Sequence, residues 1–186
     1  LSGVLEKTNE PYAIAKIAGI KMCENYNIQY KTNYKCLMPT NTFGPNDTFH
    51  SEKSHFIPAT ILKILNAIKK KQKKIIIWGN GKVKREVIFV DDLARASVYF
   101  MNKDFKDTIV NIGSEIEYTI KEFVKMICKH MKYNGKIIFD KSKPSGTPRK
   151  KLNLQKAQKL NWKAKTSFKK GLDLTLKSFE NGEIKK

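Results

Sequence analysis

A tyrosine and a lysine four residues apart, Tyr12 and Lys16, are the pair of side chains in this sequence best suited to chemistry. Pro11 precedes them, and proline at the first helical position is pre-set for a helix. Apolar residues then recur with a helical period, which predicts a helix from about Pro11 to Tyr30. Tyr12 and Lys16 would share one face of that helix. Because a nearby ammonium favours the phenolate form of a tyrosine, the pair could transfer protons beside a bound nicotinamide.

The elements that would position this pair follow from hydrophobic periodicity and turn residues. Pro58 can open a second helix, and Asp91 with Asp92 can cap a third. Thr119 and Glu122 have the spacing of a capping box. Helices after the first are expected to end near Lys70, Met101, Met131, Lys159 and Phe179, and strands are expected at 34–38, 74–78, 87–90, 109–112 and 136–139. The alternation of helices and strands predicts an α/β fold.

The spacing of Tyr12 and Lys16 alone also fits an amphipathic tyrosine beside a solvated lysine, so longer stretches of sequence are needed to decide. Five such stretches run through most of the chain: Asn9 to Gly19; Met38-Pro39-Thr40-Asn41-Thr42-Phe43-Gly44-Pro45-Asn46-Asp47; Ser54-His55-Phe56-Ile57-Pro58-Ala59; Trp78-Gly79-Asn80-Gly81 through Arg85-Glu86 to Val90-Asp91-Asp92; and Lys143-Pro144-Ser145-Gly146-Thr147-Pro148-Arg149-Lys150. In this order they resemble the carboxyl-terminal part of the GDP-L-fucose synthase family, a group of extended short-chain dehydrogenases/reductases that act on nucleotide sugars.

This resemblance implies the C-terminal part of a Rossmann-like NAD(P)-binding fold together with a smaller α/β substrate domain. Residues 1–41 and 87–112 would complete the NADP-binding domain. Residues 42–86 and 113–186 would form the nucleotide-sugar domain. Family members pair through two long helices of the Rossmann domain, so the resemblance also implies a homodimer in which the 11–30 helix lies at the interface.

The resemblance implies a reaction as well, the conversion of GDP-4-keto-6-deoxy-D-mannose to GDP-L-fucose by epimerisation at C3 and C5 and NADPH-dependent reduction at C4. Tyr12 would protonate the developing C4 alkoxide. Lys16 would support Tyr12 and bond the nicotinamide ribose. His55 matches the family's acid in the epimerisation, and imidazole can exchange a proton near neutral pH. Without the resemblance, His55 also fits an ordinary loop residue.

Two sets of ligand contacts are implied by the same resemblance. NADP(H) would be bound by Pro39, Thr40, Asn41 and Thr42 together with Tyr12, Lys16 and His55, and the GDP-sugar by Lys63, Trp78, Arg85 and Lys150. Taken alone, residues 39–42 also fit a strand end with a polar turn, Trp78 a core aromatic residue, and Lys63 a solvated helix residue. Ser145 stands where the family usually has an acidic residue, which puts a carboxylate contact to the substrate in doubt.

No glycine-rich turn of the form G-x-x-G-x-x-G or G-x-G-x-x-G occurs in the sequence. Such a turn holds the pyrophosphate of a dinucleotide at a helix N-terminus. The family carries this turn at its amino terminus, with a catalytic serine and the cysteine of the epimerisation step. We therefore expect a fragment that lacks roughly the first third of the enzyme, is inactive alone, and exposes apolar faces to water. Another nucleotide-sugar epimerase or dehydratase, or a non-catalytic basic binding protein, are the alternatives.

The net charge of +20 would ordinarily indicate a nucleic-acid partner. Lysines supply nearly all of it, because Arg85, Arg95 and Arg149 are the only arginines. The lysines are spread along the chain, and the dense run at 69–74 fits a solvated loop. RNA or DNA contact by this run is the alternative, but no nucleic-acid partner is expected.

Three cysteines, Cys23, Cys36 and Cys128, lack the spacing of zinc ligands and are expected to be buried free thiols, so no metal site is predicted. The sequence has no apolar run long enough to span a membrane, and no charged-then-apolar leader. A cytoplasmic protein without a membrane partner is therefore expected.

Overall fold

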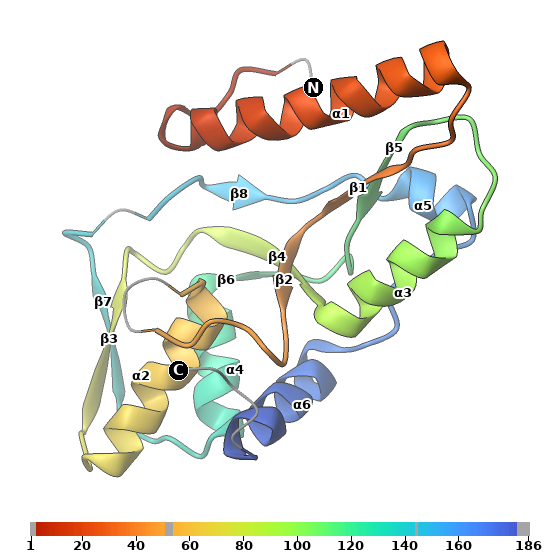
Figure 1. The fold of residues 1–186 in the computed structure, drawn as a ribbon. Helices are drawn as coiled ribbons and strands as arrows, with labels where there is room; N and C mark the ends of the chain where they lie inside the picture. Colours follow the sequence, from red (N-terminus) through yellow and green to blue (C-terminus); the bar gives the residue numbers. More distant parts are fainter. Residues whose placement is uncertain (1–2, 51–53, 144, 182–186) are drawn as a thin grey trace.

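The computed structural model describes residues 3–50, 54–143 and 145–181. Helices alternate with strands, which confirms the expected α/β class (Figure 1). The helices are the 3-10 helix η1 (Lys7–Asn9), α1 (Glu10–Tyr30), α2 (Phe56–Lys69), α3 (Val90–Met101), α4 (Ile120–His130), α5 (Gln155–Lys159) and α6 (Phe168–Glu180). The strands are β1 (Cys36–Pro39), β2 (Asn41–Phe43), β3 (Lys74–Trp78), β4 (Lys84–Phe89), β5 (Ile109–Ile112), β6 (Glu117–Thr119), β7 (Lys136–Asp140) and β8 (Arg149–Lys150).

The strands pair in three groups. β4 pairs in parallel with β2 and β8, and antiparallel with β6. β1 pairs in parallel with β5, and β3 pairs in parallel with β7, which places Trp78 opposite Asp140. Because parallel neighbours are joined by long crossovers, segments distant in sequence meet at the strand ends.

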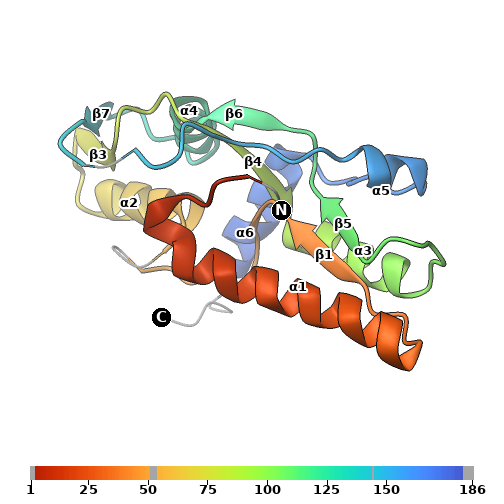
Figure 2. The same ribbon diagram turned by 90° about the horizontal axis from the view of Figure 1, so that it is seen from above.

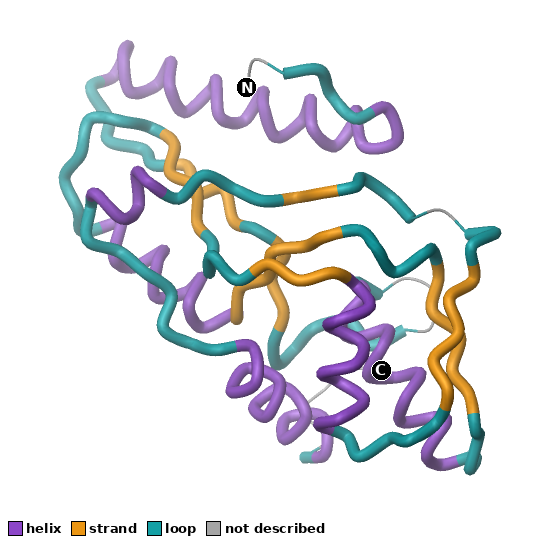
Figure 3. The backbone as a smooth tube through the Cα atoms, turned by 180° about the vertical axis from the view of Figure 1, so that it is seen from behind, coloured by secondary structure: helices purple, strands orange, loops and turns teal. Residues whose placement is uncertain are grey.

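Two hydrophobic cores hold the strands in place. The larger core lies among α2, α4, α6, β3 and β4, and its central side chains include Ile64, Phe123 and Leu172. The smaller core packs α3 and α5 against β5, around Phe100 and Ile112. Figure 3 shows α2, α4 and α6 grouped at the end of the molecule opposite α1.

Helix α1 lies outside both cores, alongside β1 and β5 (Figures 1 and 2). None of its described residues is buried, and Ile14, Met22 and Ile28 are each more than half exposed. Near its C-terminal end, the Asn27 side chain donates to the Tyr34 carbonyl (2.9 Å) and accepts from the Tyr34 amide (2.7 Å). The expected exposure of apolar surface is therefore confirmed for this helix.

The starts of the helices test the capping and proline signals that the sequence analysis used. The capping box of Thr119 and Glu122 is present at the start of α4. Pro58 does not open α2, because the helix begins at Phe56; proline is tolerated there since amides of the first turn need no intrahelical acceptor. The expected cap of α3 by Asp91 and Asp92 is wrong.

Helix α3 instead begins at Val90, with Phe89 at the cap position and no side-chain cap. Asp92 has a different set of partners. Its carboxylate accepts the backbone amides of Lys165 (3.0 Å) and Thr166 (2.9 Å), so it fastens the segment before α6 to α3. Asp92 is therefore committed to a tertiary contact and does not cap its own helix.

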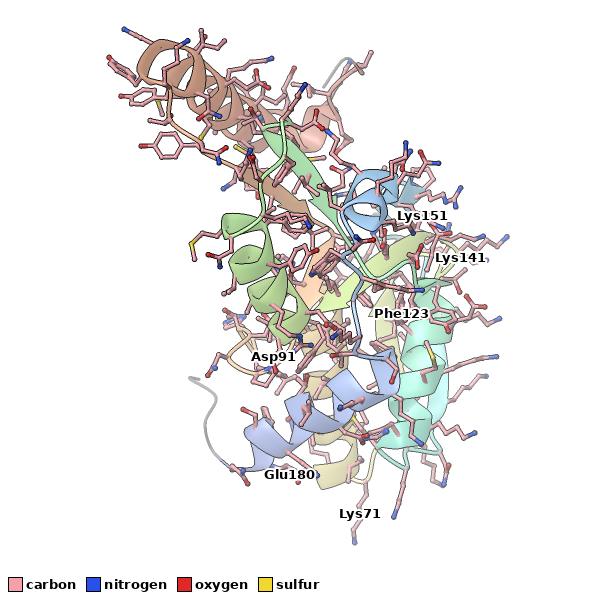
Figure 4. The ribbon with its side chains drawn as sticks, turned by 90° about the vertical axis from the view of Figure 1, so that its right-hand side faces the viewer. Lys71, Asp91, Phe123, Lys141, Lys151 and Glu180 are labelled. Carbon is pink, nitrogen blue, oxygen red and sulfur yellow. The ribbon has the colours of Figure 1, made fainter. Side chains whose placement is uncertain are left out.

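The lysine run at 69–74 is exposed, as expected of a solvated turn, and Figure 4 shows Lys71 projecting away from the body. The cysteines are free, but only Cys128 is buried. Cys23 and Cys36 are half-buried, so their expected burial is wrong; α1, which carries Cys23, has no layer of structure over its outer side. Within the described residues, no helix is long and apolar enough to span a bilayer.

Candidate active site

A cavity of about 800 Å³ opens around β2 and the loop that follows it. Its walls come from α1, from the segments 39–47 and 149–152, and from the start of α2. Of the residues expected to bind NADP(H), those that line it are Tyr12, Pro39, Thr40, Asn41, Thr42 and His55, and Lys150 lines it as well. The structure thus brings together residues that are up to 138 positions apart in sequence, from Tyr12 to Lys150.

Tyr12 and Lys16 lie on the same face of α1, as their spacing predicted. The Lys16 ammonium is 5.4 Å from the centre of the Tyr12 ring. The Tyr12 side chain lines the cavity and is 61% exposed, so its hydroxyl is accessible to a ligand. Lys16 is not among the lining residues. It contacts Tyr12, which does line the cavity.

Glu86 positions the 39–42 segment from beneath. Its backbone carbonyl accepts hydrogen bonds from the Thr40 hydroxyl (2.9 Å) and from the side-chain Nδ2 of Asn41 (3.1 Å). Its fully buried carboxylate accepts the backbone amides of Glu115 (2.9 Å) and Leu152 (3.1 Å). Glu86 therefore joins two walls of the cavity, the 39–42 segment and residues 149–152, which we call the strap.

Gly113 makes room for the Glu86 carboxylate, because a Cβ at that position would overlap it. The sequence analysis used Arg85-Glu86 as a motif but gave Glu86 no role. The only signal available in the sequence was its place within the motif.

His55 stands at the N-cap of α2, but its side chain makes no cap hydrogen bond and instead lines the cavity. The Ser54 hydroxyl before it donates to the Thr48 carbonyl (2.5 Å) and accepts the His50 amide. These bonds tie together the described ends of the loop that carries His55.

Asp47 is the one carboxylate among the described residues that line this cavity, and the sequence analysis gave it no role. Burial raises the pKa of Asp47 above the usual value, while a hydrogen bond from the Thr48 amide (2.8 Å) and the charge of His55 oppose that shift. A carboxyl group whose proton is held more tightly than usual therefore faces the same space as an imidazole.

The strap that carries Lys150 is held by its neighbour. Arg149 makes a bidentate ion pair with Glu117, at 2.7 and 3.0 Å. β8 pairs with β4 so that Lys150 lies opposite Arg85. Lys150 and Lys151 line the cavity and supply positive charge to it, which suits an anionic ligand.

A second cavity of about 240 Å³ gathers three of the four residues expected to hold the GDP-sugar, Lys63, Trp78 and Arg85. Lys150 is not among its lining residues. The two cavities adjoin, because Ser54 lines the second and His55 the first, and because Arg85 and Lys150 are partners in neighbouring strands. No carboxylate occurs among the described lining residues of the second cavity.

Trp78 is 51% exposed, so the alternative that it is a core aromatic residue is wrong. Lys63 approaches the indole ring at 5.6 Å and donates to the Ile76 carbonyl (3.0 Å). Partial burial lowers the pKa of Lys63. Lys63 is therefore a fixed, half-buried cation beside an accessible aromatic face, not a fully solvated helix residue.

Arg85 both bonds the backbone and places a positive charge in this cavity. Its Nη1 donates to the backbone carbonyls of Lys84 and Thr147, each at 2.7 Å. Burial lowers the pKa of Arg85. The Ser145 hydroxyl, which also lines this cavity, accepts the backbone amide of Asn80 (3.2 Å). Ser145, which stands in place of the usual acidic residue, therefore links its own loop to the loop of Asn80.

The two cavities differ in chemistry. The first combines groups that can exchange protons, Tyr12, His55 and Asp47, with the cationic strap. The second offers an aromatic face beside Lys63 and Arg85, an arrangement suited to a nucleotide with phosphate groups. Together they can hold an anionic ligand with its reactive end beside proton donors.

The chain is similar to known proteins in sequence and in structure. Residues 1–113 match the NAD dependent epimerase/dehydratase family. The GDP-L-fucose synthase of Escherichia coli strain K12 is 43% identical over 96% of this chain and 59% of the relative. This chain spans somewhat more than half the length of the curated relatives it matches first.

Solved structures resemble the whole described fold. A GDP-L-fucose synthetase from Naegleria fowleri bound to NADP is 26% identical with a TM-score of 0.89, covering 97% of this chain and 58% of that one. A GDP-D-glycero-L-gluco-heptose synthase from Campylobacter jejuni, solved in the presence of NADPH, is 32% identical with a TM-score of 0.82, covering 97% of this chain and 62% of that one. With the family match extending over more than half of its residues, the chain belongs to the NAD dependent epimerase/dehydratase family.

Proposed function

We propose that this chain carries the catalytic group and the GDP-sugar site of an NADP(H)-dependent enzyme that converts GDP-4-keto-6-deoxy-D-mannose to GDP-L-fucose. The observation that carries the proposal is the pair of adjoining cavities, one lined by Tyr12 and His55 and the other by Lys63, Trp78 and Arg85. The identity to curated GDP-L-fucose synthases supports the same assignment.

The residues of the larger cavity fit the nicotinamide end of NADP(H). A volume of about 800 Å³ is within the usual range for cofactor and small-molecule sites. Tyr12 and Lys16 would hold the nicotinamide ribose, residues 39–42 would lie along the ring, and His55 would face it from α2. When bound, NADPH supplies the hydride that reduces the C4 ketone.

Proton transfers would be handled by this chain's own side chains. Tyr12 would give its proton to the C4 oxygen, and the adjacent Lys16 ammonium would stabilise the phenolate left behind. The C4 ketone acidifies the neighbouring C–H bonds. In the epimerisation, a base other than Tyr12 and His55 would remove a proton, and His55 would return one to the carbon on the opposite face. General acid catalysis of this kind contributes on the order of 10² to 10⁴ in rate.

The GDP-sugar would be held in the smaller cavity and across β8. Lys63 and Arg85 would contact its phosphates, and Trp78 would contact an apolar face of the ligand. Lys150 would contact the ligand from the adjoining cavity. For the whole enzyme we also propose a homodimer, with the exposed apolar side chains of α1 at the interface. The division into an NADP-binding domain, 1–41 and 87–112, and a sugar-nucleotide domain is part of this proposal.

A GDP titration of the chain tests the nucleotide site. Trp78 is half exposed in the smaller cavity and Trp162 is buried, so ligand binding should change the fluorescence of Trp78. We expect saturable quenching by GDP, lost in Trp78→Phe. Absence of GDP binding, by fluorescence and by equilibrium dialysis with labelled GDP, would contradict the proposed substrate class.

A further inference from the structure

Lys143 approaches the exposed indole of Trp78 from the turn after β7. The β3–β7 register places Trp78 opposite Asp140, and the turn folds back over that pair, with the Lys143 amide donating to the Asp140 carbonyl (3.3 Å). Ser142 braces the turn through its amide (3.0 Å) and hydroxyl (2.6 Å), both donating to the Asp140 carboxylate. The Lys143 ammonium is 5.7 Å from the centre of the indole ring.

Two ammonium groups therefore share one aromatic side chain. Lys63 reaches Trp78 from α2 at 5.6 Å, and Lys143 reaches it from the turn at 5.7 Å. Like charges near one another disfavour each other, and each ammonium is attracted to the face of the ring. An anion at Trp78 would be attracted to both groups.

Lys143 is not among the described residues that line the smaller cavity, and it reaches this site through its contact with Trp78, which does line it. It differs from Lys63 and Arg85 in how its donors are used. Lys63 donates to the Ile76 carbonyl, and Arg85 gives one nitrogen to two backbone carbonyls. Within the described part of the chain, no hydrogen-bond acceptor is recorded for the Lys143 ammonium, although the charge of Asp140 acts on it. Its N–H groups can therefore donate to an anion that reaches Trp78.

We propose that Lys143 binds the phosphates of the nucleotide at Trp78 and sets the preference of this site for a nucleoside diphosphate. The inference deepens the proposed function and rests on it. The nucleotide lies against Trp78, and Lys143 donates to a non-bridging oxygen of the β-phosphate, which GDP and a GDP-sugar both present. The contact adds affinity in proportion to phosphate charge and adds nothing for a nucleoside without phosphates.

The test compares GDP, GMP and guanosine binding to the chain and to Lys143→Met, by Trp78 fluorescence in phosphate-free buffer. We expect Lys143→Met to weaken GDP binding about five- to tenfold and guanosine binding less than about twofold, since charge-assisted contacts act only on the charged ligand. Lys143→Arg should retain most of the GDP affinity. Lys141→Met is the matched control, because Lys141 is an exposed lysine in the same turn without a contact to Trp78.

Two results would overturn the inference and leave the proposed function standing. One is an unchanged ratio of GDP to guanosine affinity in Lys143→Met. The other is an equal loss of GDP affinity in Lys143→Met and Lys141→Met, which would reflect the general positive charge of the chain. Absence of GDP binding by the unsubstituted chain would instead reject the nucleotide site itself. Circular dichroism and the emission of buried Trp162 verify that each variant is folded.

Discussion

At the residue scale, Glu86 is a carboxylate held entirely by backbone amides. Glu86→Gln replaces one acceptor oxygen by an amide group, which leaves the amide of Glu115 or Leu152 without an acceptor. An unsatisfied buried donor costs about 1–3 kcal/mol, so we expect the free energy of unfolding to fall by that amount. Urea unfolding measures it. Glu180→Gln, at an exposed position, should change little, and equal effects of the two substitutions would contradict the role of Glu86.

Asp92 should make stability depend on pH. Burial works to raise the pKa of Asp92, but hydrogen bonds from the Lys165 and Thr166 backbone amides and from Arg95 outweigh burial, so its folded pKa lies below the usual value. The unfolded chain therefore takes up this proton first as pH falls below about 4. The stabilisation is present above that pH and is lost as pH drops through the folded pKa.

Asp92→Asn should consequently unfold more easily at pH 7 and lose less stability than the unsubstituted chain between pH 5 and pH 3. Urea midpoints measured at pH 7, 5, 4 and 3 give both quantities. Parallel curves for the two proteins would show that Asp92 does not contribute to the acid sensitivity.

The motif stretches contain Tyr12, His55, Glu86 and Asp47, but sequence reasoning gave a role only to the first two. Tyr12 and His55 were selected from their motifs, and both line the larger cavity. Glu86 and Asp47 were missed as functional residues, because their partners or shared walls lie in other segments, such as Leu152 for Glu86. A single sequence gives no measure of such contacts.

At the element scale, Asn27 makes the polar contacts that fasten the C-terminal end of α1 to the loop that follows it. The Asn27 side chain bonds the backbone of Tyr34 through both of its polar atoms and accepts from the Thr32 hydroxyl (2.9 Å). Asn27→Ala removes these bonds, which are worth about 1–2 kcal/mol together. We expect amide exchange in the last turn of α1 and in residues 31–35 to accelerate about five- to thirtyfold.

Asn33→Ala is the control for this prediction, because Asn33 is exposed and belongs to the same loop. Hydrogen exchange followed by mass spectrometry resolves the segment, and tryptic cleavage after Lys31 gives a second readout. If Asn27→Ala and Asn33→Ala exchange alike, α1 is held by something other than Asn27.

Long helices were predicted well, and short strands were not. α1 and α2 lie within two residues of their expected bounds, and α6 ends one residue after its expected end. β2, β6 and β8 have three, three and two residues, too few to show a period, and they exist as strands because each pairs with β4. β4 itself begins three residues before its expected start, at Lys84, where it pairs with both β6 and β8.

At the scale of the whole molecule, most of the residues expected to bind the sugar nucleotide lie on elements of the larger core, whereas α1 lies outside both cores. Lys63 and Arg85 are supported by the larger core, whereas Tyr12 stands on a helix without any buried residue. The curated relatives are longer than this chain, which covers 59% of the Escherichia coli protein. The absence of a glycine-rich turn from the sequence led to the expectation of uncovered apolar faces, and the exposed Ile14, Met22 and Ile28 of α1 agree with it.

The most direct test of the proposed reaction is NADPH oxidation by a chimera in which this chain replaces the matching part of the Escherichia coli relative. The chimera should consume NADPH when given GDP-4-keto-6-deoxy-D-mannose. Tyr12→Phe in the same chimera should lose on the order of 10² to 10⁴ in turnover while still binding NADPH and GDP. Equal turnover by the chimera with Tyr12 and by the folded Tyr12→Phe chimera would contradict the catalytic role of Tyr12 on which the proposed function rests.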